Sequence, residues 1–311
     1  MKLVGASLAS TLAVVVVLAG CGLGAGSTPS GVKLLVTSEF GARILPASHP
    51  LEVKGQETAM SLLVRNYPVV TSDGGGFVQS VDKLSGGQVA GQPVAWFYYV
   101  NGVEATKGAA ATNVHSGDRI WWDRHDWSQT EGIPAVVGSF PEPFLNGVEG
   151  KRLPVRVECA SVGGYACRTV AARLRALGVS PATGSIATKG DSGVLRVLVA
   201  PWTSIGARLG ARSLTRGPRA SGVYARFSTG GQELSLLDQE AHTTDTLSAG
   251  AGLIAATRQG EDAPVWLVTG TDGEGVERAA HAFDQSTLED HFAVAVSAAG
   301  AIPLPDEDQS R

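Results

Sequence analysis

The segment 96–127 constrains the fold more than any other part of the chain. It opens with the aromatic run Trp96–Val100, turns at Asn101-Gly102 and, after a second turn at Ser116–Asp118, continues as Arg119–Trp127. Asn-Gly favours the left-handed backbone of a tight hairpin turn, and strand residues alternate between two faces. The segment therefore predicts two strands in a sheet that carries aromatic side chains on both faces.

The alternation divides these side chains into two sets. One face of the second strand carries Trp121, Asp123, His125 and Trp127, and the first strand divides in the same way. One set must fill the core of a small domain, and the other must be covered by a flat ligand, by the rest of the chain or by a partner protein. The candidate ligand-binding residues are Trp96, Tyr98, Asn101, Trp121, Asp123, His125 and Trp127.

The residues before this segment complete a first domain, 32–137. A strand is predicted at Val32–Thr37, and a second one across 42–53. Apolar residues recur with helical spacing within Glu57–Tyr67, where Thr58 is the candidate N-cap. Two strands, a helix and two further strands predict a small mixed sheet crossed by one helix, which is a β-grasp-like fold.

The aromatic hairpin also resembles a known family. The runs Trp96–Gly102 and Ser116–Trp122 are similar to the transcobalamin-type C-terminal domain, in which an aromatic strand enters Val-Asn-Gly, a turn ends in Gly-Asp, and the next strand carries tryptophan. In the vitamin-B12 carriers of animals, this β-grasp-like module closes over one face of cobalamin. The resemblance implies the fold and names a corrinoid as a candidate ligand. The helical barrel that holds the vitamin in those carriers has no counterpart in this sequence.

After a Pro/Gly-rich linker, 138–152, the pattern changes to alternating strands and helices. This alternation favours a mixed sheet packed by helices, in an α/β domain at 153–302. The predicted class of the whole chain is therefore α+β, and the acidic tail 303–311 is expected to be flexible. The elements expected in the second domain are strands at 153–159, 194–199, 223–227, 234–237, 265–268 and 291–296, a helix that ends at Gly178, and a helix at 274–283.

The N-terminal residues predict export and lipid anchoring. Lys2 precedes the uncharged, mostly apolar stretch Leu3–Leu18, and small residues lead to Cys21. This order is typical of a secretory signal, and Leu-Ala-Gly-Cys resembles the bacterial lipobox. We therefore expect 1–20 to be a lipoprotein signal peptide and 21–31 a Gly/Ser-rich tether. Cys21 would carry palmitate and hold the protein at the extracytoplasmic face of the cell membrane. A membrane-spanning helix is disfavoured because the apolar run falls short of ~20 residues.

The two remaining cysteines fit an exported protein. Cys159 and Cys167 lie eight positions apart and can close a small loop in an oxidising compartment. A metal pair or a redox dithiol is the alternative, although both usually require closer spacing or further ligands. We predict a disulfide.

Metal and nucleic-acid sites are not expected. Asp123 and His125 share a strand face that His115 could approach, but such dispersed ligands lack the fixed spacing of a metal site. The chain has 25 basic and 29 acidic residues, and this balance argues against nucleic acid, which requires clustered positive charge. We predict no metal and no cofactor.

The sequence carries no enzyme signature. The motifs Gly-x-Ser-x-Gly and His-Glu-x-x-His are absent, and Asp238 and Glu240 lie in a polar, turn-like stretch. Gly270–Gly273 follows a predicted strand but lacks the spacing of nucleotide-binding loops, whereas Asp272 suits an N-cap. We therefore expect no catalytic residues.

The expected function is that of a non-enzymatic envelope lipoprotein that binds a small ligand for uptake. Its expected partners are membrane lipid through Cys21, a small molecule such as a corrinoid, and a membrane transporter component. One alternative is a structural or protein-interaction lipoprotein, in which the aromatic side chains join the domains or contact a partner. Another is a hydrolase that acts through the second domain.

Overall fold

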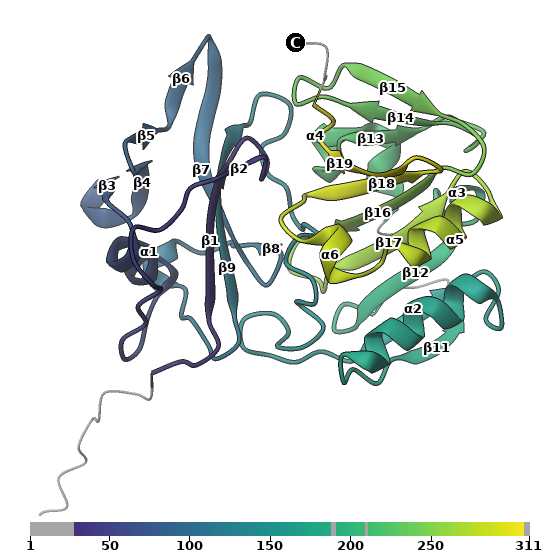
Figure 1. Ribbon diagram of the computed structural model, residues 1–311, viewed down its shortest axis with the longest axis horizontal. Helices are drawn as coiled ribbons and strands as arrows, with labels where there is room; N and C mark the ends of the chain where they lie inside the picture. The colour runs from purple at the N-terminus through teal and green to yellow at the C-terminus, as the bar shows by residue number, and fades with distance from the viewer. Residues whose placement is uncertain (1–27, 188–190, 209–210, 308–311) are drawn as a thin grey trace, which may run out of the picture.

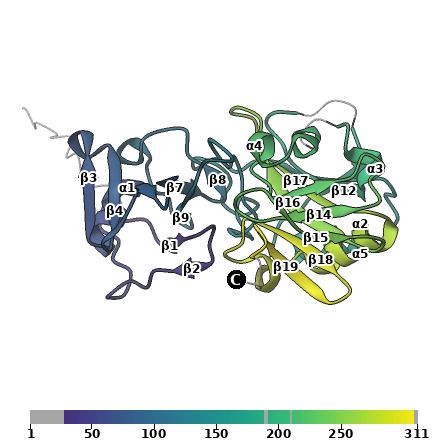
Figure 2. The same ribbon diagram turned by 90° about the horizontal axis from the view of Figure 1, so that it is seen from above.

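The computed structural model describes residues 28–187, 191–208 and 211–307, and shows two domains side by side (Figures 1 and 2). The predicted signal peptide, Cys21 and most of the predicted tether lie outside these residues. Each domain combines a sheet with helices, so the chain is a mixed α+β protein, as predicted. Within the described residues, the helices are too short or too polar to cross a membrane.

The N-terminal domain is built on one mixed sheet and one small antiparallel sheet. The strands of the mixed sheet are β1 Lys33–Ser38, β2 Arg43–Ile44, β6 Gly87–Val89, β7 Gln92–Val100, β8 Val103–Glu104 and β9 Arg119–Asp126. Their order is β2-β1-β9-β7-β6, with β8 paired to β7. In this sheet β1 runs parallel to β9, and β7 runs antiparallel to β9. The small sheet contains β3 Val69–Ser72, β4 Phe77–Val81 and β5 Leu84–Ser85.

Helix α1, Ala59–Asn66, packs on one face of the mixed sheet and begins as predicted. The hydroxyl of Thr58 accepts a hydrogen bond from the Ser61 amide, and the Ser61 hydroxyl accepts one from the Thr58 amide. This reciprocal capping satisfies two amides that would otherwise lack partners. The second strand predicted across 42–53 is much shorter than expected, because only β2, Arg43–Ile44, forms there. Pro46 and Pro50 have no amide hydrogen to donate to a neighbouring strand.

The predicted Asn-Gly turn joins β7 to β8. Asn101 and Gly102 have φ angles of 54° and 78°, and Val100 pairs with Val103 across the turn. The buried Asn101 amide nitrogen donates to Asp118 Oδ1 at 2.8 Å and to the Gly147 carbonyl at 3.0 Å. The Asn101 side chain therefore ties the hairpin to the linker that follows the domain.

The second domain has a seven-stranded sheet covered on both faces. Its strands are β10 Val155–Cys159, β11 Ala182–Ser185, β12 Leu195–Pro201, β16 Gly252–Thr257, β17 Val265–Gly270, β18 Ala293–Ser297 and β19 Gly300–Leu304. Their order is β11-β10-β12-β17-β16-β18-β19. The first four in this order are parallel, and β16, β18 and β19 join with antiparallel pairing.

Helices cover one face of this sheet, and a small sheet covers the other (Figure 1). The first face is covered by α2 Tyr165–Ala176 and α5 Gly273–His281, with α6 Gln285–Leu288 nearby. On the other face lie α3 Trp202–Ile205, α4 Pro218–Ser221, β13 Ala225–Phe227, β14 Leu234–Leu237 and β15 Thr243–Leu247. The predicted alternation of strands and helices is thus correct, although β11, β15, β16 and β19 were not foreseen.

Three local features of this domain can be compared with the prediction. The predicted disulfide between Cys159 and Cys167 is present and fastens the start of α2 to the end of β10. The predicted linker is packed rather than free, since Phe140 and Phe144 enter the core beneath α2 and α5. The last strand ends at Leu304, so β19 includes the first two residues of the predicted tail.

The two domains share a hydrophobic core centred on Phe292, which immediately precedes β18. Its ring lies 5.5 Å from Phe40, 5.6 Å from Tyr99, 5.0 Å from Trp121 and 5.6 Å from His125, measured between centroids. All four rings belong to the N-terminal domain and are buried. The second domain therefore covers the sheet face opposite α1.

An ionic contact lies beside this core. The buried guanidinium of Arg119 contacts Glu289 at 2.9 Å and also Asp290, both from the second domain. Because only 7% of the Arg119 side chain is exposed, removing both acids would leave a buried charge without a partner.

Phe292→Ala should lower the free energy of unfolding by about 3–5 kcal/mol, because it empties an aromatic site at the centre of the interface. Trp121 would also lose its cover, so acrylamide should quench tryptophan fluorescence more strongly. Urea denaturation and quenching measure the two effects. Phe77→Ala is the control, since Phe77 is 49% exposed and should change neither quantity appreciably. Equal behaviour of the two variants would contradict a shared core.

Candidate functional site

The predicted ligand-binding residues do not form one surface. Trp96 and Tyr98 lie on the face of the sheet beneath α1, whereas Trp121, Asp123 and His125 lie on the opposite face, toward the second domain. All five side chains are buried. Among the predicted ligand-binding residues only Trp127, with 40% of its surface exposed, is substantially accessible in the described structure.

The two aromatic residues beneath α1 are bound to loops of their own domain. Tyr98 stacks on Trp122 with a centroid distance of 4.7 Å, and its hydroxyl donates to the Lys107 carbonyl at 2.5 Å. The indole nitrogen of Trp96 donates to the Leu84 carbonyl at 3.2 Å. These contacts account for the polar atoms of both side chains within the core.

On the opposite face, Asp123 anchors the turn between β1 and β2. Its carboxylate accepts hydrogen bonds from the Thr37 hydroxyl at 2.5 Å and from the amides of Phe40 and Gly41 at 3.2 and 2.9 Å. The Nδ1 atom of His125 lies 2.7 Å from the same carboxylate. These hydrogen bonds give the buried carboxyl group of Asp123 four partners within the domain.

The imidazole of His125 lies between two aromatic rings. It stacks on Phe40 and Phe97 with centroid distances of 4.6 and 4.4 Å. His115 is not brought to this pair, because its Nδ1 atom lies 3.3 Å from Asp118 instead. The contacts on this face therefore support packing between the domains. From the sequence, the rest of the chain was one of three possible covers for this face of the sheet, beside a flat ligand and a partner protein.

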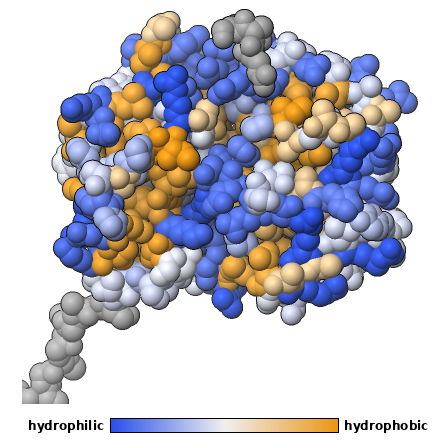
Figure 3. All heavy atoms as spheres, in the orientation of Figure 1, coloured by the Kyte–Doolittle hydropathy of each residue, from blue (hydrophilic) through white to orange (hydrophobic). Residues whose placement is uncertain are grey.

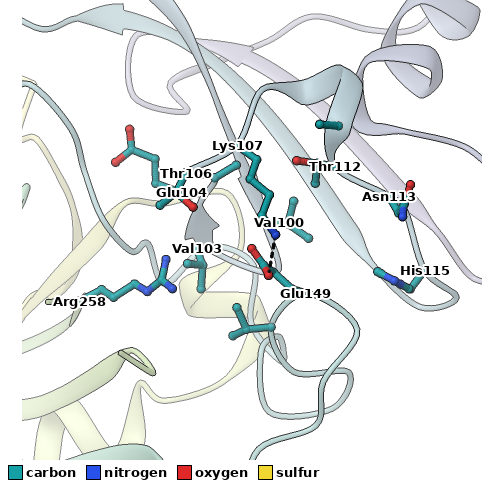
Figure 4. A pocket seen from close by; sticks show the side chains of 13 residues that line it. Val100, Val103, Glu104, Thr106, Lys107, Thr112, Asn113, His115, Glu149 and Arg258 are labelled. Atoms are coloured by element: carbon teal, nitrogen blue, oxygen red, sulfur yellow. Dashed lines mark hydrogen bonds and ion pairs between the residues drawn. The ribbon is translucent and has the colours of Figure 1, made fainter. Parts of the chain in front are cut away.

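A cavity of about 180 Å³ lies where the N-terminal domain, the linker and the second domain meet (Figure 4). Lys107 and Glu149 form an ion pair of 3.1 Å at its wall, and Arg258 extends toward them from the second domain. The Arg258 guanidinium donates to the carbonyls of Asp262 and Glu261 at 2.7 and 3.1 Å. The lining consists of Val100, Val103, Glu104, Ala105, Thr106, Lys107, Ala111, Thr112, Asn113, His115, Val148, Glu149 and Arg258.

Glu104 is the most perturbed acid in this lining. Burial raises the pKa of its carboxyl to about 7, although a hydrogen bond from the Ile133 amide opposes the shift. The carboxylate packs against Gly132, where an added Cβ would lie 2.8 Å from Oε2. Within the described part of the chain, no basic side chain forms an ion pair with Glu104. The carboxyl therefore exchanges a proton near neutral pH.

This cavity was not predicted from the sequence. Its walls come from residues 100–115, from Val148 and Glu149, and from Arg258, and these segments meet only after the domains pack together. No local spacing marks such a site. The cavity combines an apolar floor with cations, carboxylates and hydroxyl groups, which suits recognition of a small polar molecule.

Two further motifs are placed by the structure. Asp272 caps α5 as predicted, because its carboxylate accepts from the Gly275 amide at 2.8 Å, so Gly270–Gly273 is a helix start. Asp238 and Glu240, noted above as a polar turn, lie close to His242. The sequence prediction did not include this third residue, although the three occupy alternate positions of the loop.

One comparison with known families bears on the N-terminal domain. No curated protein matches the chain. Residues 56–126 match the family model described as "Domain of unknown function (DUF4430)". The matched segment runs from the turn before α1 to the end of β9, and thus includes the aromatic hairpin and much of the cavity lining. The N-terminal domain therefore contains a DUF4430 domain at residues 56–126.

Proposed function

We propose that this chain is a membrane-anchored extracytoplasmic lipoprotein that binds a small polar ligand for uptake and catalyses no reaction. The observation that carries the proposal is the cavity between the domains, which holds charges of both signs. The order of residues before Cys21 supports the lipid anchor. The disulfide supports an oxidising compartment, since such bonds are rare in the cytosol.

The cavity favours a ligand with both an anionic and a hydrogen-bonding group. Lys107, Arg258 and His115 supply positive or donor groups, and Glu104 and Glu149 supply acceptors. A volume of about 180 Å³ lies below the ~300–1,000 Å³ typical of drug-sized ligands. An amino acid or a short carboxylic acid suits this space better than a whole corrinoid. The resemblance to the transcobalamin-type domain is an analogy of fold, so cobalamin belongs in the test as a candidate.

A second candidate function is protein interaction at the envelope. Figure 3 shows hydrophobic side chains gathered over the N-terminal domain. Among the described residues, the large hydrophobic side chains with the greatest exposure in this domain are Ile44, Leu51, Val64, Val70, Phe77, Val89 and Trp127. Exposed apolar surface of this kind often marks a contact with a partner protein.

A ligand panel tests the proposed binding. Amino acids, short dicarboxylic acids, sugars and cobalamin are to be screened by thermal shift with the full chain in detergent, and hits are to be titrated by calorimetry. Arg258→Ala should weaken binding of a hit by tenfold or more, because it removes a cation of the lining. Arg43→Ala, an exposed arginine outside the cavity, should leave the affinity unchanged. If no compound binds, or if Arg258→Ala binds a hit as tightly as the wild type, this cavity is not the ligand site.

The raised pKa of Glu104 predicts a pH-dependent stability. Above its ordinary pKa of 4.5 the unfolded chain releases this proton, whereas the folded chain retains it until about pH 7. The free energy of unfolding therefore falls as pH rises from about 4.5 to 7, by up to ~3 kcal/mol. Glu104→Gln should remove this fall, so urea midpoints at pH 5 and pH 8 should differ less than in the wild type. Glu131→Gln, which removes an exposed carboxylate, should keep the wild-type profile; an unchanged profile in Glu104→Gln would refute the assignment.

The proposed lipid anchor has its own test. Cells that express the full chain should incorporate labelled palmitate into it and retain it in the membrane fraction. Cys21→Ser should abolish the label and release the protein, whereas a variant with both Cys159 and Cys167 replaced by alanine should still be labelled. Label that persists in Cys21→Ser would show that the anchor is placed wrongly.

A further inference from the structure

An exposed run without Asp, Glu, Lys or Arg begins in β2 of the N-terminal domain. This segment, 44–51, reads Ile-Leu-Pro-Ala-Ser-His-Pro-Leu. All of its residues except Leu45 are exposed, with Ile44 at 59% and Leu51 at 39%. Apolar residues that are exposed singly are normal on protein surfaces, whereas a contiguous apolar patch commonly marks an interaction site.

Hydrogen bonds fix both ends of this segment on the domain. At its start, the Leu45 amide donates to the Val36 carbonyl at 2.8 Å, and the Leu45 carbonyl accepts from the Tyr67 hydroxyl at 2.9 Å. Just past its end, the buried Asn66 side chain accepts from the Glu52 amide at 2.8 Å and donates to the Glu52 carbonyl at 2.9 Å. The exposed apolar side chains are therefore presented by an ordered backbone, which lowers the entropy that a contact would cost.

The Leu51 end of the segment lies beside the point where the chain enters the domain. The Thr28 hydroxyl accepts a hydrogen bond from the Gly55 amide at 3.0 Å. Val32 and Leu51 line one groove of about 340 Å³, and Figure 3 shows hydrophobic surface close to where the described chain begins. Thr28 is seven residues from Cys21, and seven extended residues span at most about 25 Å. A lipid on Cys21 would therefore keep a bilayer within reach of this surface.

A contact that is weak by itself suffices at such a short distance from an anchor. Linking a weak contact to a tight one raises its effective concentration to the order of millimolar. Interfacial binding grows with the apolar area buried and with the attraction of cations to anionic lipid. The exposed Lys33 lines the same groove as Leu51, and the two acids of that groove, Glu289 and Asp290, contact Arg119.

The other end of the segment borders an acidic surface. Arg43 lines a second and larger cavity of about 640 Å³, between the turn after β1, the loop between β14 and β15, and the end of β19. It pairs with Glu39 at 3.0 Å. Anionic headgroups repel carboxylates and attract cations, so contact with lipid is expected at Leu51 rather than at this cavity. The further carboxylates of the cavity lining are Asp238, Glu240, Asp306 and Glu307.

We propose that the Leu51 end of the 44–51 segment docks on the outer face of the bilayer that holds the lipid of Cys21. The proposal rests on the lipid anchor proposed above and adds an orientation to it. The segment continues from β2, at one edge of the N-terminal sheet, and β6 forms the opposite edge. The side with the segment faces the lipid, and β6 faces away from it.

Brominated lipid tests the docking, because bromine quenches tryptophan fluorescence on contact. Leu51→Trp and Val89→Trp add one tryptophan to the segment and to β6, and the two positions are matched at 39% and 44% exposure. Each full chain, lipidated in bacterial cells, is reconstituted into vesicles of phosphatidylglycerol and phosphatidylethanolamine. Five of the six native tryptophans are buried, which keeps the background low. Bromine on the acyl chains should quench the added emission of Leu51→Trp at least about twofold more than that of Val89→Trp.

Flotation of the same vesicles separates the anchor from the docking. A chain that does not float contradicts the lipid on Cys21; a chain that begins at Cys21 and is coupled through its thiol to a maleimide-bearing lipid then decides the docking by the same comparison. Equal quenching of the two variants in chains that float overturns the docking. Protection of Leu51→Trp from acrylamide that appears only in native membranes also overturns it, since it indicates a protein partner. Circular dichroism checks that both variants are folded.

Discussion

The insertion of Phe292 among the aromatic rings of the N-terminal domain is the contact on which the rest of the structure depends. Phe292 shields from solvent the face of β9 that carries Trp121 and His125, and the small N-terminal domain has no element of its own on that face among the described residues. The aromatic richness of the hairpin thus serves two cores, one beneath α1 and one shared between domains. Neither set of rings is left as an open platform for a ligand.

The same interface creates the two cavities. Rings and apolar side chains pack closely around Phe292, whereas polar loops meet at the margins and leave space between them. The smaller cavity is lined by both Glu104 and Arg258, and the lining of the larger one is rich in carboxylates. The cavities differ in charge, because cations and carboxylates both line the first, whereas carboxylates dominate the lining of the second.

Local signals in the sequence predict much of the fold. Thr58 marks the start of α1, Asn101-Gly102 marks the hairpin turn, and the cysteine spacing predicts the disulfide, because each depends on neighbours within ten residues. Alternation also separates the faces of β9 correctly, but it does not say what covers them. The cavity residues were not predictable, since Glu104 and Arg258 come to line one cavity only when the two domains pack together.

Strand β1 completes the central pairing of the N-terminal sheet. Residues 56–126 match the family model, yet β1, at Lys33–Ser38, pairs with β9 along six residues and lies outside that segment. A fragment cut at the family limits would leave β9 as an unpaired edge, with Trp121 uncovered, and such edges invite aggregation. The unit recognised by sequence comparison is therefore smaller than the unit that folds, and recombination of this module between proteins must carry β1 along with it.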